Sequence, residues 1–115
     1  MAIKGTPTCW LIADSFARSF LAADELAHLQ EVPTSETDWK SVEKAKKQME
    51  VAISSLQAHL GEEAATTMGV GFGKIEQGLS YHDIVEVHNG AEKIQEVLLR
   101  DGLIAVVQEC GRTEH

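Results

Sequence analysis

Apolar residues recur at alternating intervals of three and four positions in four separate stretches of this chain. This spacing matches the 3.6-residue turn of an α-helix, so each stretch predicts a helix with one apolar face. Because the loops between the stretches are short, consecutive helices are expected to pack side by side in opposite directions. The most regular stretch places these residues on one face: Trp39, Val42, Ala45, Met49, Ala52, Leu56 and Leu60.

The first helix is expected to follow a short N-terminal arm. Residues 1–8 form this arm, and Thr8 can cap a helix that begins at Cys9. Pro33 disfavours a helical conformation in the residue before it, so this helix is expected to end near Gln30. Its apolar residues cover much of the helix circumference, which is typical of a helix that is central or lies at an interface.

The second helix is expected over residues 38–60. Ser35 followed by Asp38 forms a shortened capping box, in which the serine side chain satisfies a free N–H of the first turn. Gly61 is expected to end the helix in the left-handed conformation, which glycine adopts without steric cost.

Residues 62–79 fit two different structures. Their apolar residues follow the helical spacing, whereas Gly69, Gly71 and Gly73 alternate with apolar residues as in a strand. Each interior glycine costs a helix about 1 kcal/mol relative to alanine. We favour a helix, because the apolar series extends beyond the glycines on both sides. These glycines are then expected to serve close packing or bending.

The fourth helix is expected to begin after a second shortened capping box, formed by Ser80 and Asp83. The pair Asn89-Gly90 is a turn signal that threatens a break within this helix. Gly102 is expected to stop it. The short apolar segment that follows fits either a helical turn or a strand.

These elements predict a mostly α fold, an antiparallel four- to five-helix bundle. As an alternative for two of its segments, residues 68–75 and 103–109 form one short strand pair in an otherwise helical bundle. All 115 residues are expected to form a single helical domain, with residues 111–115 as a frayed tail. A compact chain of this length has a radius of gyration of roughly 13 Å.

The charge balance argues against nucleic acid and membrane partners. The chain carries 10 Lys and Arg against 18 Asp and Glu, a net charge of −8. Proteins that bind phosphate backbones or anionic lipid surfaces need an excess of basic side chains. A second protein with a basic surface is compatible with this charge.

Cys9 and Cys110 are the only cysteines. No secretory signal or membrane-spanning apolar run is apparent, so we expect a cytoplasmic protein with two reduced, buried thiols. A disulfide between the two ends of the chain is the less favoured alternative.

Three short motifs resemble ligand sites but remain incomplete. Glu25 and His28 have the spacing of one half of a dinuclear metal site, and no second half exists. His82 and Glu86 share a helical face but lack further ligands for zinc. Residues 69–74 lack the spacing of a phosphate-binding loop. We therefore assign no catalytic residue, metal site or cofactor.

The function predicted from these patterns is protein–protein interaction without catalysis, either self-association or the masking of a partner. A homodimer is expected, because a small bundle leaves apolar surface that needs cover. Trp10, Phe20 and Leu21 are the expected interface residues.

The alternative function is that of a small-molecule-binding protein or enzyme with a pocket between helices. That pocket is expected near residues 69–74 and 81–86, and its candidate residues are Phe72, Lys74, Tyr81, His82 and Glu86.

Overall fold

The computed structural model describes residues 7–111, of which 86% are helical and none lies in a strand. Its elements are α1 (Pro7–Ala27), α2 (Glu36–Gln57), α3 (Glu62–Ser80), α4 (Ile84–Val97), the π-helical turn η1 (Leu98–Gly102) and α5 (Leu103–Gly111). The mostly α prediction is confirmed. The alternative strand pair is wrong, because residues 68–75 lie in α3 and residues 103–109 lie in α5.

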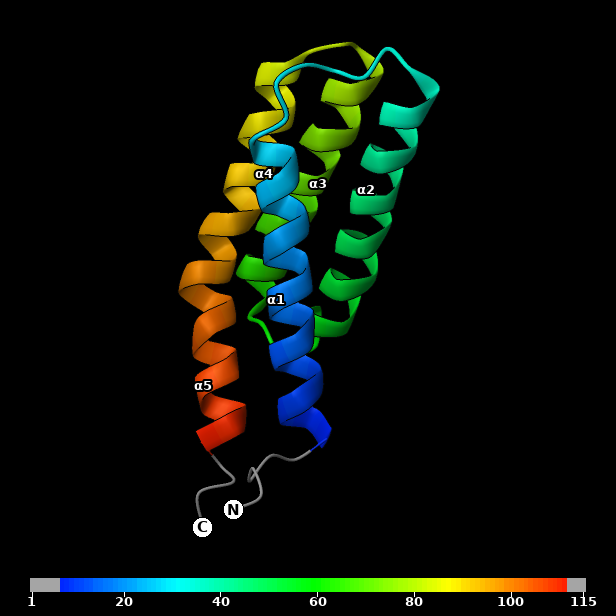
Figure 1. Ribbon diagram of the computed structural model, residues 1–115. Coiled ribbons are helices and arrows are strands. Elements are labelled where there is room, and N and C mark those ends of the chain that lie inside the picture. Colours follow the sequence, from blue (N-terminus) through cyan, green and yellow to red (C-terminus); the bar gives the residue numbers. More distant parts are fainter. Residues whose placement is uncertain (1–6, 112–115) are drawn as a thin grey trace.

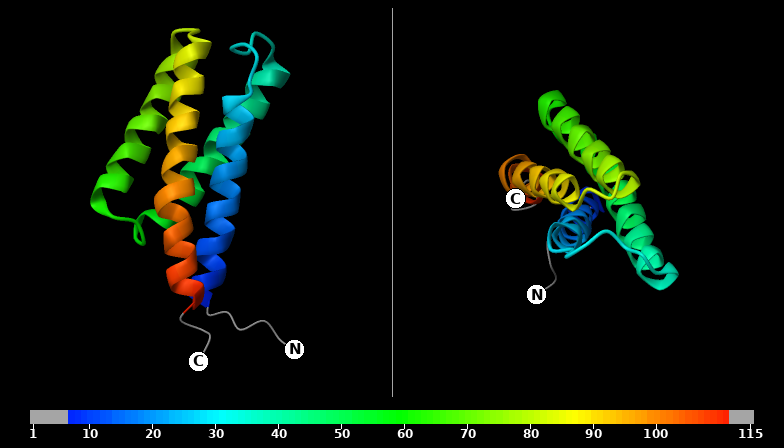
Figure 2. Two further views of the ribbon diagram at one scale, coloured as in Figure 1. Left: turned by 90° about the vertical axis from the view of Figure 1, so that its left-hand side faces the viewer. Right: turned by 90° about the horizontal axis from the view of Figure 1, so that it is seen from above.

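Successive long helices alternate in direction along the molecule (Figure 1). α4, η1 and α5 follow one another without a break and form one long rod. α1 contacts α2 and this rod, while α3 packs against α4. The first turns of α1 and most of α5 reach past the loop that joins α2 to α3 (Figure 2). The radius of gyration is 15.1 Å and the extents are 52 × 29 × 18 Å, so the molecule is more elongated than expected.

The core contains the apolar faces that the residue spacing predicts. Five members of the regular series are buried on α2, and Trp39 near its start is partly buried. Leu60 is also partly buried but lies beyond the end of α2, because this helix stops at Gln57 and not at residue 60. The largest fully buried side chains of the other helices are Ile12, Leu26, Met68, Ile75, Ile94 and Leu98. Hydrophobic burial therefore joins side chains from α1, α2, α3, α4 and η1 in one cluster.

α3 and α4 approach each other backbone to backbone where Gly71 faces Gly90. A Cβ atom on Gly71 would lie 2.9 Å from the carbonyl oxygen of Gly90, and a Cβ on Gly90 would overlap the carbonyl oxygen of Gly71. Gly78 lies similarly close to Val87 of α4. Glycine is required at these positions because a larger residue would push the helices apart.

Replacing Gly71 or Gly90 by alanine is expected to lower the free energy of unfolding by about 1–3 kcal/mol, because the added Cβ has no space. Gly69→Ala and Gly73→Ala are the matched controls, since a Cβ at either position meets no atom within 4 Å. Alanine favours a helix over glycine by about 1 kcal/mol, so the controls should be more stable than the parent. Urea denaturation measures both shifts. Equal effects of Gly71→Ala and Gly69→Ala would contradict the close crossing.

The start of α1 differs from the prediction, and the start of α2 agrees with it. α1 begins at Pro7 rather than Cys9, because proline fits the first helical turn, where its missing N–H removes no hydrogen bond. The rest of the predicted arm, residues 1–6, lies outside the described residues. α1 ends at Ala27, three residues before the expected end. Ser35 caps α2 as predicted, and its hydroxyl accepts a hydrogen bond of 3.1 Å from the N–H of Asp38.

Two predicted helix boundaries are wrong. Gly61 has a φ of −69° and precedes α3, so it does not end α2 in the left-handed conformation. Asp83, and not Ser80, caps α4: its carboxylate accepts a 3.2 Å hydrogen bond from the N–H of Glu86. Ser80 is the last residue of α3. The carboxylate is a strong cap by itself, which leaves no role for the serine.

The rod formed by α4, η1 and α5 contains neither of the two predicted interruptions. α4 continues through Asn89 and Gly90 because Gly90 is needed at the crossing with α3. Gly102 does not stop the helix but lies in the π-helical turn η1. A Cβ at Gly102 would lie 3.1 Å from the ring of Phe16, so this glycine makes room for an aromatic side chain of α1.

Cys9 and Cys110 form a disulfide, with their Cα atoms 4.9 Å apart, so the prediction of two reduced thiols is wrong. The bond joins the first turn of α1 to the last turn of α5. These turns lie side by side because α1 and the rod run in opposite directions (Figure 1). A separation of 101 residues gives no local sequence signal for this pairing.

Loss of the disulfide is expected to lower the free energy of unfolding by about 2–5 kcal/mol, because the unfolded chain would regain the freedom of a long loop. Guanidinium denaturation with and without a reductant measures this change. The double variant Cys9→Ser/Cys110→Ser is the control and should not respond to the reductant. Two titratable thiols in the folded, unreduced protein would contradict the pairing.

Candidate functional site

A groove of about 520 Å³ runs between α1 and α2. Two grooves between α2 and α3 are much smaller, about 190 and 160 Å³. The residues that line the larger groove are Leu11, Asp14, Ser15, Arg18, Lys44, Lys47, Gln48, Val51, Ala52 and Ser55. We call it the α1–α2 groove. None of these residues was predicted as a site residue. The sequence feature that could have indicated the groove is the presence of apolar residues, such as Leu11 and Val51, outside the apolar series that predicts each helix.

The wall of the α1–α2 groove combines apolar side chains with the hydroxyl of Ser15. Leu11 and Val51 are about half exposed, and Ala52 is buried. Ser15 is only 4% exposed, and its hydroxyl forms no hydrogen bond within the described residues. By contrast, the Ser19 hydroxyl donates a 2.7 Å hydrogen bond to the carbonyl oxygen of Ser15. The Ser15 hydroxyl therefore remains available to a group in the groove.

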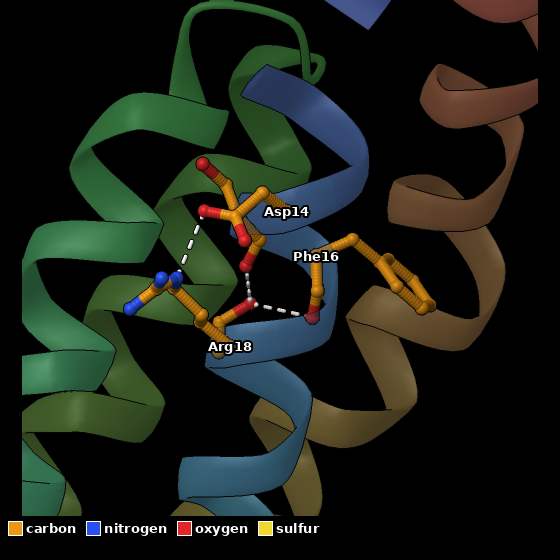
Figure 3. Close-up of polar contacts among 5 residues, drawn as sticks. Asp14, Phe16 and Arg18 are labelled. Carbon is orange, nitrogen blue, oxygen red and sulfur yellow. Dashed lines mark hydrogen bonds and ion pairs between the residues drawn. The ribbon is translucent and has the colours of Figure 1, made fainter. Parts of the chain in front are cut away.

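The margin of the groove is rich in cations. Arg18 donates through Nε to the carboxylate of Asp14 at 2.8 Å, and both side chains are largely exposed. Figure 3 shows this pair on one side of α1 and Phe16 pointing to the other. Lys47 lies 3.5 Å from Glu50, also in an exposed pair. Exposed pairs of this kind are weak and readily exchange partners.

The five residues predicted for the alternative pocket do not gather around one cavity. Lys74 of α3 and Glu86 of α4 form an ion pair at 3.7 Å. Tyr81 is 75% exposed, and His82 occupies the turn between these helices with a φ of 55°. Phe72 faces α2 and lines both smaller grooves. The structure thus joins two of the five residues and leaves the others apart.

The predicted interface residues occupy different surroundings on α1. Trp10 and Leu21 are exposed, whereas Phe20 is partly buried and stacks on Phe16 with ring centroids 6.1 Å apart. Near the disulfide, α5 also exposes apolar side chains, which include Leu103, Ile104 and Val107.

Residues of the two incomplete metal motifs contact other side chains. His28 contacts its helical neighbour Asp24, and Glu86 pairs with Lys74. Across residues 7–111 there is no group of three or more His, Cys, Asp or Glu side chains that could hold a metal ion. None of the described helices is long and apolar enough to cross a membrane.

Comparisons of the chain with protein-family models, with curated proteins and with solved structures found no match.

Proposed function

We propose that this acidic protein acts without catalysis, through protein–protein interaction, and that it self-associates as a homodimer. The supporting observation is a group of large apolar side chains on α1, η1 and α5 that are 45–67% exposed. We call this surface the α1–α5 face; its residues are Trp10, Leu21, Leu99, Leu103 and Val107. Water contact with such a surface is unfavourable, and a protein partner would remove it.

Helix geometry supports one continuous face. Trp10 and Leu21 are eleven positions apart, about three turns of α1, and therefore point in the same direction. Leu103 and Val107 are four positions apart and share a side of α5. The disulfide sets the alignment of the two helices, and the buried Ala105 fixes which side of α5 faces the core. With this arrangement, the exposed apolar side of α1 and that of α5 lie on the outer surface of the two packed helices.

The α1–α5 face would form the centre of a dimer interface and its surroundings the rim. Trp10 and Leu21 are about 16 Å apart along α1, and two adjacent helices span about 20 Å. An interface of standard size buries about 800 Å² on each partner. A second copy placed across a twofold axis would set the same apolar residues against one another.

The charge of the chain works against self-association but does not prevent it. The chain carries a net charge of −8. Charges on two copies are screened within about 10 Å at ordinary salt, so two copies can still meet through the apolar α1–α5 face.

The disulfide also changes the expected location. The cytoplasmic prediction, made from the sequence without an apparent secretory signal, implied reduced thiols, whereas Cys9 and Cys110 are joined. Disulfides persist in oxidising compartments and are rare in the cytosol. We therefore favour an oxidising compartment over the cytoplasm.

Trp10→Glu or Leu21→Glu is expected to convert the dimer to a monomer, because each places a charge in the apolar interface. Analytical ultracentrifugation at micromolar concentration should show wild-type protein at twice the 12.5 kDa chain mass and both variants near 12.5 kDa. Val70→Glu is the matched control: Val70 is also about half exposed but lies on α3. A monomeric wild type, or equal dissociation of the control, would refute the proposed interface.

A further inference from the structure

We propose that the α1–α2 groove is a binding site for a small amphipathic anion, a carboxylate attached to an apolar chain. This site is separate from the α1–α5 face and does not depend on the self-association proposed above. Its volume of about 520 Å³ falls within the range of small-molecule sites. The ligand class follows from three features of the wall: its apolar floor, the Ser15 hydroxyl that no described residue pairs with, and its cationic margin.

The apolar floor of the groove indicates that the ligand carries an apolar chain. Leu11 projects from α1, while Val51 and Ala52 project from the facing side of α2. Leu11 and Val51 remain about half exposed although they lie between two packed helices. An alkyl chain lying along the groove would cover both side chains and remove their apolar surface from water.

The Ser15 hydroxyl indicates that the ligand carries a polar group. Ser15 is 4% exposed and lines the groove, yet its hydroxyl has no hydrogen-bond partner among the described residues. Within the described residues no buried side-chain polar atom lacks a hydrogen-bond partner, so this hydroxyl reaches the solvent of the groove, where a ligand group can replace water. A hydroxyl can donate a hydrogen bond to a carboxylate oxygen.

The cationic margin determines the sign of the ligand's charge. Three of the chain's ten Lys and Arg residues line this groove: Arg18, Lys44 and Lys47. Lys44 forms no ion pair within the described residues, and Arg18 keeps its terminal NH₂ groups when Nε contacts Asp14. Asp14 is the only acidic residue among those lining the groove. A carboxylate would therefore meet more opposite than like charge, and charge-assisted hydrogen bonds are the stronger kind.

Octanoate is the probe that tests this proposal, with octanol and octylammonium as neutral and cationic ligands of equal chain length. Isothermal titration calorimetry on the full chain with its disulfide intact is expected to show octanoate binding about tenfold or more tightly than octylammonium. Amide chemical-shift changes should be confined to the facing segments of α1 and α2. Equal affinity for the three ligands, or shifts elsewhere, would overturn the proposal.

Variants distinguish the proposed contacts from general surface attraction. Lys44→Gln and Ser15→Ala are each expected to weaken octanoate binding at least about threefold, through loss of a charge or of a hydrogen bond. Lys40→Gln is the matched control, because Lys40 lies exposed on the same helix, α2, outside the groove. Val51→Trp should fill the groove and abolish binding while circular dichroism remains unchanged. Equal losses in Lys44→Gln and Lys40→Gln would refute a specific site.

Discussion

The crossing of α3 and α4 at Gly71 and Gly90 fixes the distance between these two helices, because their backbones touch there. The side chains of Ile75 and Ile94 pack beside the two glycines and fill the space around the contact. α1 packs against both α2 and α4. The backbones of α2 and α3 stay further apart, and these helices meet through side chains such as Lys46, which lies 3.8 Å from Glu76. Two of the smaller grooves lie between α2 and α3, where the backbones are separated.

Almost every side of α1 carries side chains that contact another part of the protein or form an apolar surface. Ile12 and Ser19 point into the core, and Phe16 packs toward Gly102 of the rod. Leu11 and Ser15 line the groove shared with α2. Trp10 belongs to the outer surface. The wide apolar distribution that marks this helix in the sequence therefore has several causes, and only part of it remains for a partner protein.

Features that depend on a single helix were predictable from the sequence. The buried face of α2 follows from the intervals between its apolar residues, and Ser35 caps it through a contact three residues away. Asp83 was part of a predicted capping signal, although its exact role was misassigned. Such interactions involve neighbours within about one helical turn, so residue order alone specifies them.

Features that join distant segments were not predictable in this way. Gly69, Gly71 and Gly73 look equivalent in sequence, and only the position of Gly90 on α4 distinguishes the central one. The disulfide requires the two ends of the chain to meet, which depends on how many helices reverse direction. The α1–α2 groove depends on the separation between two helices. No interval between residues encodes that separation.

The bond between Cys9 and Cys110 closes the described chain into a covalent ring, because it joins residues near both ends. In a ring, one cut in a loop opens the circle but releases no piece. A protease that cleaves the connection between α1 and α2, or the one between α2 and α3, would leave every helix attached to the rest. The nicked molecule would stay in one covalent piece, heavier by the one water that hydrolysis adds, until a reductant separated the two fragments. The chain can therefore tolerate backbone damage in its exposed loops that would divide a linear protein in two.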